Sequence, residues 1–219
     1  MGEPCACPPN SHADEAERIG RHFDERFQDW QPVGPEATDL LFAWVHEAGL
    51  PGATFLDVGC GTGELILRAL EAGATQATGA DLSSEAIAMT SDLVHEAGFG
   101  DRVDLWVGDA AVESLAPHDI VVLDKVICCY PDAETLIARS TAAARQVYAF
   151  ALPESRGFWG FIAKTRWFVF DLIERIRGDP LPRFIHDRSE IESRVMAAGF
   201  TPLHTGRRYV WFVGVYARS

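Results

Sequence analysis

The stretch Asp57-Val-Gly-Cys-Gly-Thr-Gly63 decides how this chain folds. An apolar run at 54–56 precedes it, and a helical pattern begins directly after it at Glu64. Glycines at a turn between a strand and a helix let the backbone come close to a ligand, and the start of the helix offers free N–H groups. The stretch therefore predicts a ligand-binding turn at the carboxyl end of a strand.

Two further aspartates follow predicted strands in the same way. Asp81 ends the next strand, 18 residues past Gly63, and Asp109 follows the third strand after Gly108. An acid at about the distance of Asp81 suits hydrogen bonding to ribose hydroxyls. Because ligands of open α/β sheets bind at the carboxyl ends of the strands, we expect Asp57, Asp81 and Asp109 on one edge.

Predicted strands and helices alternate along the middle of the chain. The apolar run Ile120-Val-Val-Leu123 is typical of a strand buried on both faces. The series predicts an α/β fold with a doubly wound, mostly parallel seven-stranded sheet, a C-terminal antiparallel hairpin and an inserted helical segment. The expected strands cover 54–56, 76–80, 103–107, 119–123, 147–151, 201–205 and 209–216, the last two joined around Gly206, and the expected helices cover 13–30, 35–48, 64–71, 84–97, 133–144, 158–170 and 187–198.

The length of 219 residues suits one domain. We expect a flexible tail over 1–11 and a single domain over 12–219. Within it, 12–50 would form N-terminal cap helices, and 152–190 would form an insertion that caps the acceptor.

The region 54–151 resembles the class I S-adenosylmethionine (SAM)-dependent methyltransferases, on the strength of the glycine turn and the following acids. A dinucleotide-binding dehydrogenase is the structural alternative, but its glycines run GxGxxG, whereas these run GxGxG. The resemblance implies SAM as cofactor and S-adenosylhomocysteine (SAH) as product. It implies a methionine end near Asp57 and Gly59, a ribose on Asp81 and an adenine near Leu82, Asp109 and Ala110. The implied cofactor residues are Asp57, Gly59, Cys60, Gly61, Gly63, Asp81, Leu82, Asp109, Ala110 and Asp124.

The segment 119–131 is similar, more weakly, to the corresponding one in magnesium-protoporphyrin methyltransferases, which also ends in Tyr-Pro. The likeness extends to Phe184-Ile-His186-Asp187. Where that family has a histidine before Tyr-Pro, this chain has Cys129. An unperturbed cysteine is mostly protonated near pH 7, so this departure argues against a porphyrin acceptor.

Candidate residues for chemistry and for the acceptor are aromatic, acidic or basic side chains near these motifs. A histidine of this kind is as readily structural, and the aromatic spacing also describes helices packed on a core. The aromatic segment 158–170 is compatible with a substrate cap, with plain core or with contact to a membrane surface. The catalytic candidates are His22, Asp124, Tyr130 and His186, and the substrate-binding candidates are Phe23, Phe27, Cys129, Tyr130, Trp159 and Arg166.

Charge and composition limit the classes of partner that we expect. The net charge is −13, with 8 basic and 25 acidic residues in 1–150 but 11 basic and 7 acidic residues in 151–219. Such an acidic chain is not expected to bind nucleic acid broadly. It has no apolar run of about 20 residues and no secretory signal pattern, so we expect a cytoplasmic protein. Cys5, Cys7 and His12 could hold a metal, but we expect none.

These observations predict a methyltransferase that transfers the methyl group of SAM to an oxygen or nitrogen atom of a small molecule, acidic or aromatic. The alternative is a SAM-binding protein without transferase activity, which would serve as a sensor or partner subunit. The oligomeric state stays open.

Overall fold

The computed structural model of the chain describes residues 11–27, 35–177 and 184–219, and the side chains of 14–25, 36–169 and 184–219. The expected tail, with Cys5 and Cys7, lies outside the described residues, except that Ser11 begins the first helix. The side chains of His12 and Phe27 also lie outside the described part.

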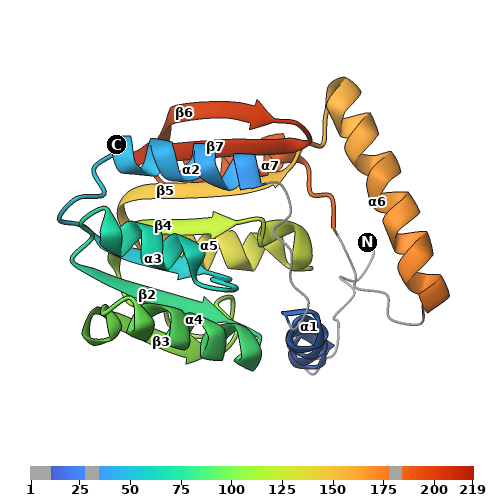
Figure 1. Cartoon of the computed structure of the whole chain (residues 1–219). Helices are drawn as coiled ribbons and strands as arrows, with labels where there is room; N and C mark the ends of the chain where they lie inside the picture. The colour runs from blue at the N-terminus through green and yellow to red at the C-terminus, as the bar shows by residue number, and fades with distance from the viewer. Residues whose placement is uncertain (1–10, 28–34, 178–183) are drawn as a thin grey trace, which may run out of the picture.

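Seven strands form one sheet in the order β3-β2-β1-β4-β5-β7-β6 (Figure 1). The first five strands are parallel, and β7 runs antiparallel to both β5 and β6, which confirms the predicted fold class. The strands are β1 (Thr54–Val58), β2 (Gln76–Asp81), β3 (Val103–Val107), β4 (His118–Asp124), β5 (Ala144–Pro153), β6 (Phe200–Arg208) and β7 (Trp211–Arg218).

Helices cover both faces of the sheet (Figure 1). Along the apolar run of β4, Ile120 and Val122 pack with α2, α3 and α4, whereas Val121 and Leu123 pack with α5 and α7. This alternation explains why the strand is apolar throughout. The helices are α1 (Ser11–Phe27), α2 (Pro35–Glu47), α3 (Glu64–Glu71), α4 (Ser84–Glu96), α5 (Ala133–Ala143), α6 (Gly157–Arg177) and α7 (Arg188–Ala197), with short 3-10 turns η1 (Gly100–Arg102) and η2 (Ile127–Cys129).

The register of the parallel strands brings the expected acids to one edge. Val58 pairs with Ala80 of β2, and Asp57 pairs with Val122 of β4. Asp81 and Asp124 therefore lie one residue beyond Val58, on either side of β1. The prediction that the strand-end aspartates share the carboxyl edge is confirmed.

The two N-terminal helices occupy different places. α1 lies at the carboxyl edge and packs on α4, where Asp24 Oδ1 accepts hydrogen bonds from Ser83 Oγ at 2.6 Å and Glu85 N at 3.0 Å. α2 instead packs on β5 and β7, with Leu41 and Val45 fully buried. The expectation of cap helices over 12–50 thus describes the position of α1 better than that of α2.

The C-terminal hairpin turns at a different place from the one predicted. Gly206 lies inside β6 and pairs with Val213, and the chain reverses at Tyr209, whose φ is 51°. A Cβ on Gly206 would lie 2.9 Å from the ring of Trp44 in α2. The prediction of a join around Gly206 was wrong, because this glycine permits close packing of a helix rather than a turn.

Candidate functional site

A pocket of about 330 Å³ opens at the carboxyl edge of the sheet. Its walls come from the glycine turn after β1, the ends of β2 and β3, the loop after β4, and side chains of α1, α2 and α6. Nine of the ten residues expected at the cofactor line it, and the tenth, Gly63, lies between the lining residues Thr62 and Glu64. The pocket therefore gathers residues that are far apart in the sequence.

The glycine turn uses backbone conformations that other residues rarely adopt. Gly59, Gly61 and Gly63 have φ values of 73°, 54° and 78°. A Cβ on Gly59 would lie 2.4 Å from Cγ2 of Val126, and one on Gly63 would lie 2.6 Å from Cγ2 of Thr90. Both the positive φ and the close packing require glycine here.

Asp81 is held by the backbone around it. Its Oδ2 accepts a hydrogen bond from Gly61 N at 2.9 Å, and its Oδ1 accepts one from Ser83 N at 2.9 Å. Burial raises the pKa of Asp81, and the N–H groups of Ser83 and Gly61 counteract part of that effect. Since each carboxylate oxygen can accept a further hydrogen bond, this fixed carboxylate can still bind a pair of hydroxyls.

Asp57 and Asp124 each keep one oxygen without a partner. Asp57 is 2% exposed, and neither its Oδ1 nor that of Asp124 meets a hydrogen-bond donor among the described residues. Burial raises the pKa of Asp57 well above its usual range, and the charges of Asp124 and Asp81 raise it further. Two neighbouring acids, each with a buried oxygen that meets no donor among the described residues, provide a site for a cation.

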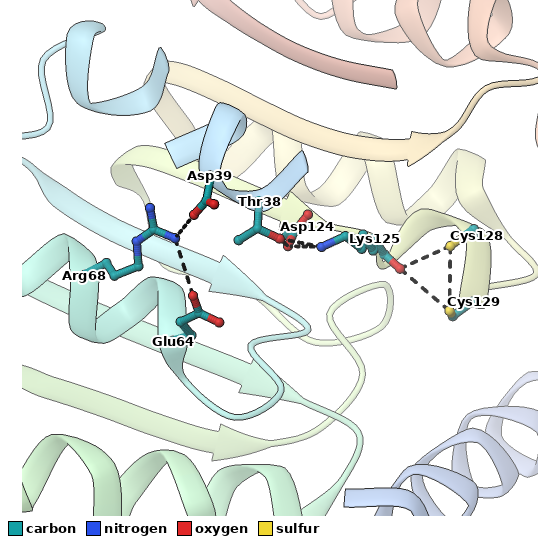
Figure 2. Close-up of polar contacts among 8 residues, drawn as sticks. All are labelled: Thr38, Asp39, Glu64, Arg68, Asp124, Lys125, Cys128 and Cys129. Atoms are coloured by element: carbon teal, nitrogen blue, oxygen red, sulfur yellow. Dashed lines mark hydrogen bonds and ion pairs between the residues drawn. The ribbon is translucent and has the colours of Figure 1, made fainter. Parts of the chain in front are cut away.

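Thr38, Asp124 and Lys125 form a small network on the pocket wall (Figure 2). Thr38 Oγ1 of α2 donates to Asp124 Oδ2 at 2.6 Å, and Lys125 Nζ donates to the same oxygen at 2.9 Å and to Thr38 Oγ1. Asp124 and Lys125 therefore form an ion pair. It fixes Asp124 Oδ2 and leaves Oδ1 for other contacts.

The hydroxyl of Tyr130 belongs to the third strand end. It donates to Asp109 Oδ2 at 2.8 Å, while Asp109 Oδ1 accepts from Ala111 N at 2.9 Å. Burial and the bond to Asp109 raise the pKa of Tyr130. Tyr130 thus stays protonated and joins the loop after β4 to the turn expected to contact adenine.

Three cysteines line the pocket. Burial raises the pKa of Cys60 well above its usual range, so its thiol is a neutral packing group. Cys128 and Cys129 both direct their Sγ atoms to the carbonyl oxygen of Lys125, at 3.2 Å and 3.7 Å, and lie 3.8 Å from each other (Figure 2). Cys129 is therefore on the pocket wall, where the sequence analysis expected it.

The remaining acceptor candidates divide between the pocket and its surroundings. Phe23 of α1 and Arg166 of α6 line the pocket. Trp159 instead stacks under the guanidinium of Arg207, 4.5 Å from the ring centroid to Cζ, outside the described lining. Phe27 ends α1, but its side chain is not among those described.

Neither candidate histidine reaches the described lining of the pocket. His22 is buried in α1, with its ring 5.7 Å from that of Phe23. His186 Nε2 lies 3.0 Å from the backbone oxygen of Tyr130, which a ring N–H satisfies. Both positions favour structural roles.

Two lining residues, Thr38 and Trp211, had no signal in the sequence, whereas Trp167 belongs to the aromatic segment 158–170 that was offered as a substrate cap. The three come from α2, β7 and α6, and only the tertiary fold brings them together. The rings of Trp167 and Trp211 meet edge to face at 5.7 Å.

An ion pair connects α2 and α3 beside the pocket. Arg68 of α3 lies 2.9 Å from Asp39 of α2 and 3.4 Å from Glu64 of its own helix, and so holds the two helices side by side (Figure 2).

Comparison with known proteins agrees with this arrangement. Residues 55–149 match the family described as Methyltransferase domain. The ribosomal protein L11 methyltransferase of Alteromonas mediterranea is 29% identical over 118 residues, which make up 50% of this chain and 40% of that protein. The chain thus spans well under half the length of the curated relatives that it matches.

Two solved structures resemble the whole chain. Magnesium protoporphyrin IX methyltransferase from Synechocystis PCC 6803 with bound SAH superposes with a TM-score of 0.71 at 20% identity, over 94% of this chain and 100% of that one. The 1,6-didemethyltoxoflavin-N1-methyltransferase of Burkholderia thailandensis, with its substrate and SAH bound, gives 0.69 at 21% identity, over 100% and 93%. The family match confirms the resemblance drawn from the sequence, and the Synechocystis enzyme has been solved with SAH and with SAM bound. Residues 55–149 are thus similar to the methyltransferase domain family, and the chain as a whole shares its fold with these solved methyltransferases.

Proposed function

We propose that the chain binds SAM in this pocket and transfers its methyl group to an oxygen or nitrogen atom of a small-molecule acceptor. The observation that carries the proposal is the pair of carboxylates beside the glycine turn, Asp57 and Asp124, each with a buried Oδ1 that meets no donor among the described residues. SAM brings a sulfonium and an ammonium group. Cations of this kind stabilise buried carboxylates, so the cofactor would supply what both acids lack.

The ribose and the adenine of SAM would lie along the ends of β2 and β3. The backbone-held carboxylate of Asp81 suits the ribose hydroxyls, and Leu82, Asp109 and Ala110 line the pocket where the adenine would lie. The tie from Tyr130 to Asp109 would keep this end in shape. Each of these contacts rests on a short side chain at a fixed strand end.

The acceptor would lie among Lys125, Trp167 and Trp211. Lys125 Nζ lies 5.7 Å from the ring centroid of Trp211, and the two indoles form a corner. Aromatic walls with a cation nearby favour a planar acceptor that carries a carboxylate or phenolate. Arg166 adds a second cation on the same wall. A pocket of about 330 Å³ suits a small molecule better than a folded protein.

Methyl transfer asks little of the protein beyond position. The acceptor lone pair attacks the methyl carbon in line with the breaking carbon–sulfur bond, the sulfonium becomes the thioether of SAH, and the acceptor gives up a proton. Holding the two reactants aligned accounts for much of the rate. Because the sulfonium becomes a neutral thioether in this step, Asp124 Oδ1 would lose a cationic partner and could then take the proton.

The alternative function, SAM binding without transfer, is supported by a different observation. No histidine occurs among the described residues that line the pocket, and the hydroxyl of Tyr130 is engaged with Asp109. An assay of SAH release separates the two functions. A transferase forms SAH with at least one member of a panel of aromatic acids, phenols and amines, whereas a sensor binds SAM and leaves it intact throughout.

The first experiment is calorimetric titration of the ligand-free chain with SAM, SAH and NADH. We expect both adenosyl ligands to bind and NADH not to bind. Asp81→Ala should weaken SAH binding at least about tenfold, because hydrogen bonds to a charged group contribute about 1.5–3 kcal/mol. Asp104→Ala, which removes an exposed aspartate of β3, is the matched control.

Each result bears on a separate claim. If neither adenosyl ligand bound, the cofactor assignment and the transferase proposal would both fail. If Asp81→Ala bound SAH as tightly as the wild type, the ribose would lie elsewhere while the cofactor assignment stood.

A further inference from the structure

The outer face of α6 is apolar and open to solvent. Phe158, Phe161 and Phe168 are 70%, 68% and 69% exposed, and Val169 is 48% exposed. At about 100° per residue these four positions fall on one side of the helix. The opposite side faces the body of the protein, where Ala163 is fully buried. Three exposed phenylalanines on one side of a helix, interrupted by the exposed Thr165, mark an interaction surface rather than ordinary scatter.

Basic residues border this stripe. Lys164 and Arg166 are exposed and, by the same helical spacing, flank the phenylalanines on opposite sides. Between Glu154 and Asp171 the chain has three basic residues and no acidic one, although its net charge is −13. The face of α6 is therefore locally cationic on an acidic protein.

The turn between β6 and β7 extends the same surface. Arg207 stacks over Trp159 at the start of α6, with 4.5 Å between Cζ and the ring centroid, and its Nη1 donates to the backbone oxygen of Tyr209 at 2.6 Å. Arg208 is exposed, and Tyr209 is 62% exposed. The stack on Trp159 fixes a second basic and aromatic element beside the helix.

We propose that the outer face of α6 and the β6–β7 turn dock on an anionic membrane surface. The phenylalanines would enter the boundary between headgroups and acyl chains, and the flanking cations would reach the anionic headgroups. Among the described residues, no helix is long and apolar enough to cross a membrane, so α6 would lie flat. A two-fold contact between copies through this face would set Lys164 and Arg166 against their own copies, whereas anionic lipid neutralises them.

Docking in this way would place the pocket close to the lipid. Arg166 and Trp167, on the flank and inner side of α6, line the pocket. An acceptor dissolved in the membrane would then have a short path to it. The docking proposal itself does not depend on the proposed function, because its test needs neither SAM nor an acceptor.

The test is flotation of the full chain with vesicles of phosphatidylcholine alone and with a quarter phosphatidylglycerol. We expect binding to the anionic vesicles, at least about tenfold weaker binding to neutral ones, and a marked loss at high salt. The triple variant Phe158→Ser, Phe161→Ser, Phe168→Ser should lose at least about tenfold in partitioning, because it removes three large apolar side chains. Its thermal unfolding should match the wild type, since all three side chains are exposed.

A matched control removes exposed apolar side chains elsewhere. Met196→Ser with Leu203→Ser, which are 46% and 48% exposed, should leave vesicle binding unchanged. Lys164→Glu with Arg208→Glu should weaken binding to anionic vesicles alone. The proposal is overturned if the folded wild type binds neither vesicle, if it binds both equally, or if the triple variant binds as well as the wild type. It is also overturned if light scattering shows a dimer that the triple variant abolishes.

Discussion

The two ends of the pocket are built in different ways. At the end proposed for the cofactor, the lining comes from strand ends, from backbone N–H groups such as Gly61 N, and from short acids placed by the sheet register. At the end proposed for the acceptor, it comes from long side chains such as Trp167, Arg166 and Lys125, carried by elements far apart in the chain. At the first end, few other residue types could take the same positions. At the second end, single side chains can be substituted without disturbing the sheet.

The largest effect on cofactor binding is expected for Gly59→Ala. Alanine would have to adopt the positive φ of Gly59, and its Cβ would lie 2.4 Å from Cγ2 of Val126. Strain of about 1–2 kcal/mol adds to the steric clash, and we expect SAH affinity to fall at least about a hundredfold in calorimetry.

Gly98→Ala is the control for backbone strain without a steric clash. Gly98 has a φ of 79° but no atom within 4 Å of the position of a Cβ, so this variant carries strain without a clash. It should lose stability and keep SAH affinity. If Gly59→Ala still bound SAH normally, the close packing of the turn would not matter for the cofactor.

The next largest effect is expected for Asp57→Asn, with opposite signs on stability and binding. A neutral amide removes a buried charge that lacks a donor at Oδ1, so the free energy of unfolding should rise by about 1–3 kcal/mol at neutral pH. SAM affinity should fall about tenfold, because a cationic ligand loses a charge partner. Thermal unfolding and calorimetry on the same samples measure both. A variant that is less stable and binds SAM normally would contradict the assignment.

The same residue predicts a pH dependence. Because burial raises the pKa of Asp57, the folded state holds this proton more tightly than the unfolded chain does. The contribution of Asp57 to stability should therefore fall as pH rises from its usual pKa to the raised value. SAM prefers the ionised carboxylate, so its affinity should fall as pH drops through the raised pKa. Asp57→Asn should flatten that part of the profile.

A smaller effect is expected for Tyr130→Phe, which removes only the hydroxyl bonded to Asp109. The loss of one buried hydrogen bond to a carboxylate should weaken SAH binding about fivefold to tenfold. Tyr209→Phe, at an exposed tyrosine of the hairpin turn, is the control and should bind SAH as the wild type does. If Tyr130→Phe changed acceptor turnover but not SAH affinity, the hydroxyl would belong to the acceptor end instead.

The smallest effect on the cofactor is expected at the acceptor end itself. Trp167→Phe keeps an aromatic side chain near Trp211, and SAH affinity should stay within about twofold of the wild type. Calorimetry provides the measurement. A tenfold loss would show that α6 takes part in cofactor binding and would remove the distinction between the two ends.

The fold could be predicted because local patterns and the sheet agree. The apolar run 120–123 marks a strand covered on both faces, and the glycine turn marks the start of α3. The failure at Gly206 has a physical cause, since a glycine that admits Trp44 looks the same in sequence as a glycine that makes a turn. The actual turn residue, Tyr209, has no turn propensity to reveal its positive φ.

The candidate site was predictable in the same uneven way. Asp57, Asp81 and Asp109 stand at strand ends, so their meeting follows from the topology alone. Thr38 could not be found, because nothing in α2 shows that its hydroxyl will meet Asp124 across 86 positions of sequence. The histidines were chosen for their chemistry, yet helix packing at His22 and a backbone contact at His186 decide where they lie.

The segment between β5 and α7 is closed at its base. Arg188 N donates to Ser155 Oγ at 2.9 Å, and Arg188 Nη1 bonds Glu154 Oε2 at 2.9 Å, so the chain leaves and rejoins the sheet at one point. The entropy of closing a loop grows only slowly with its length. A change in the length of residues 156–187 therefore adds little to the entropic cost of closing this loop. On the proposed function, this junction is where the domain could acquire a new acceptor, in evolution as in engineering.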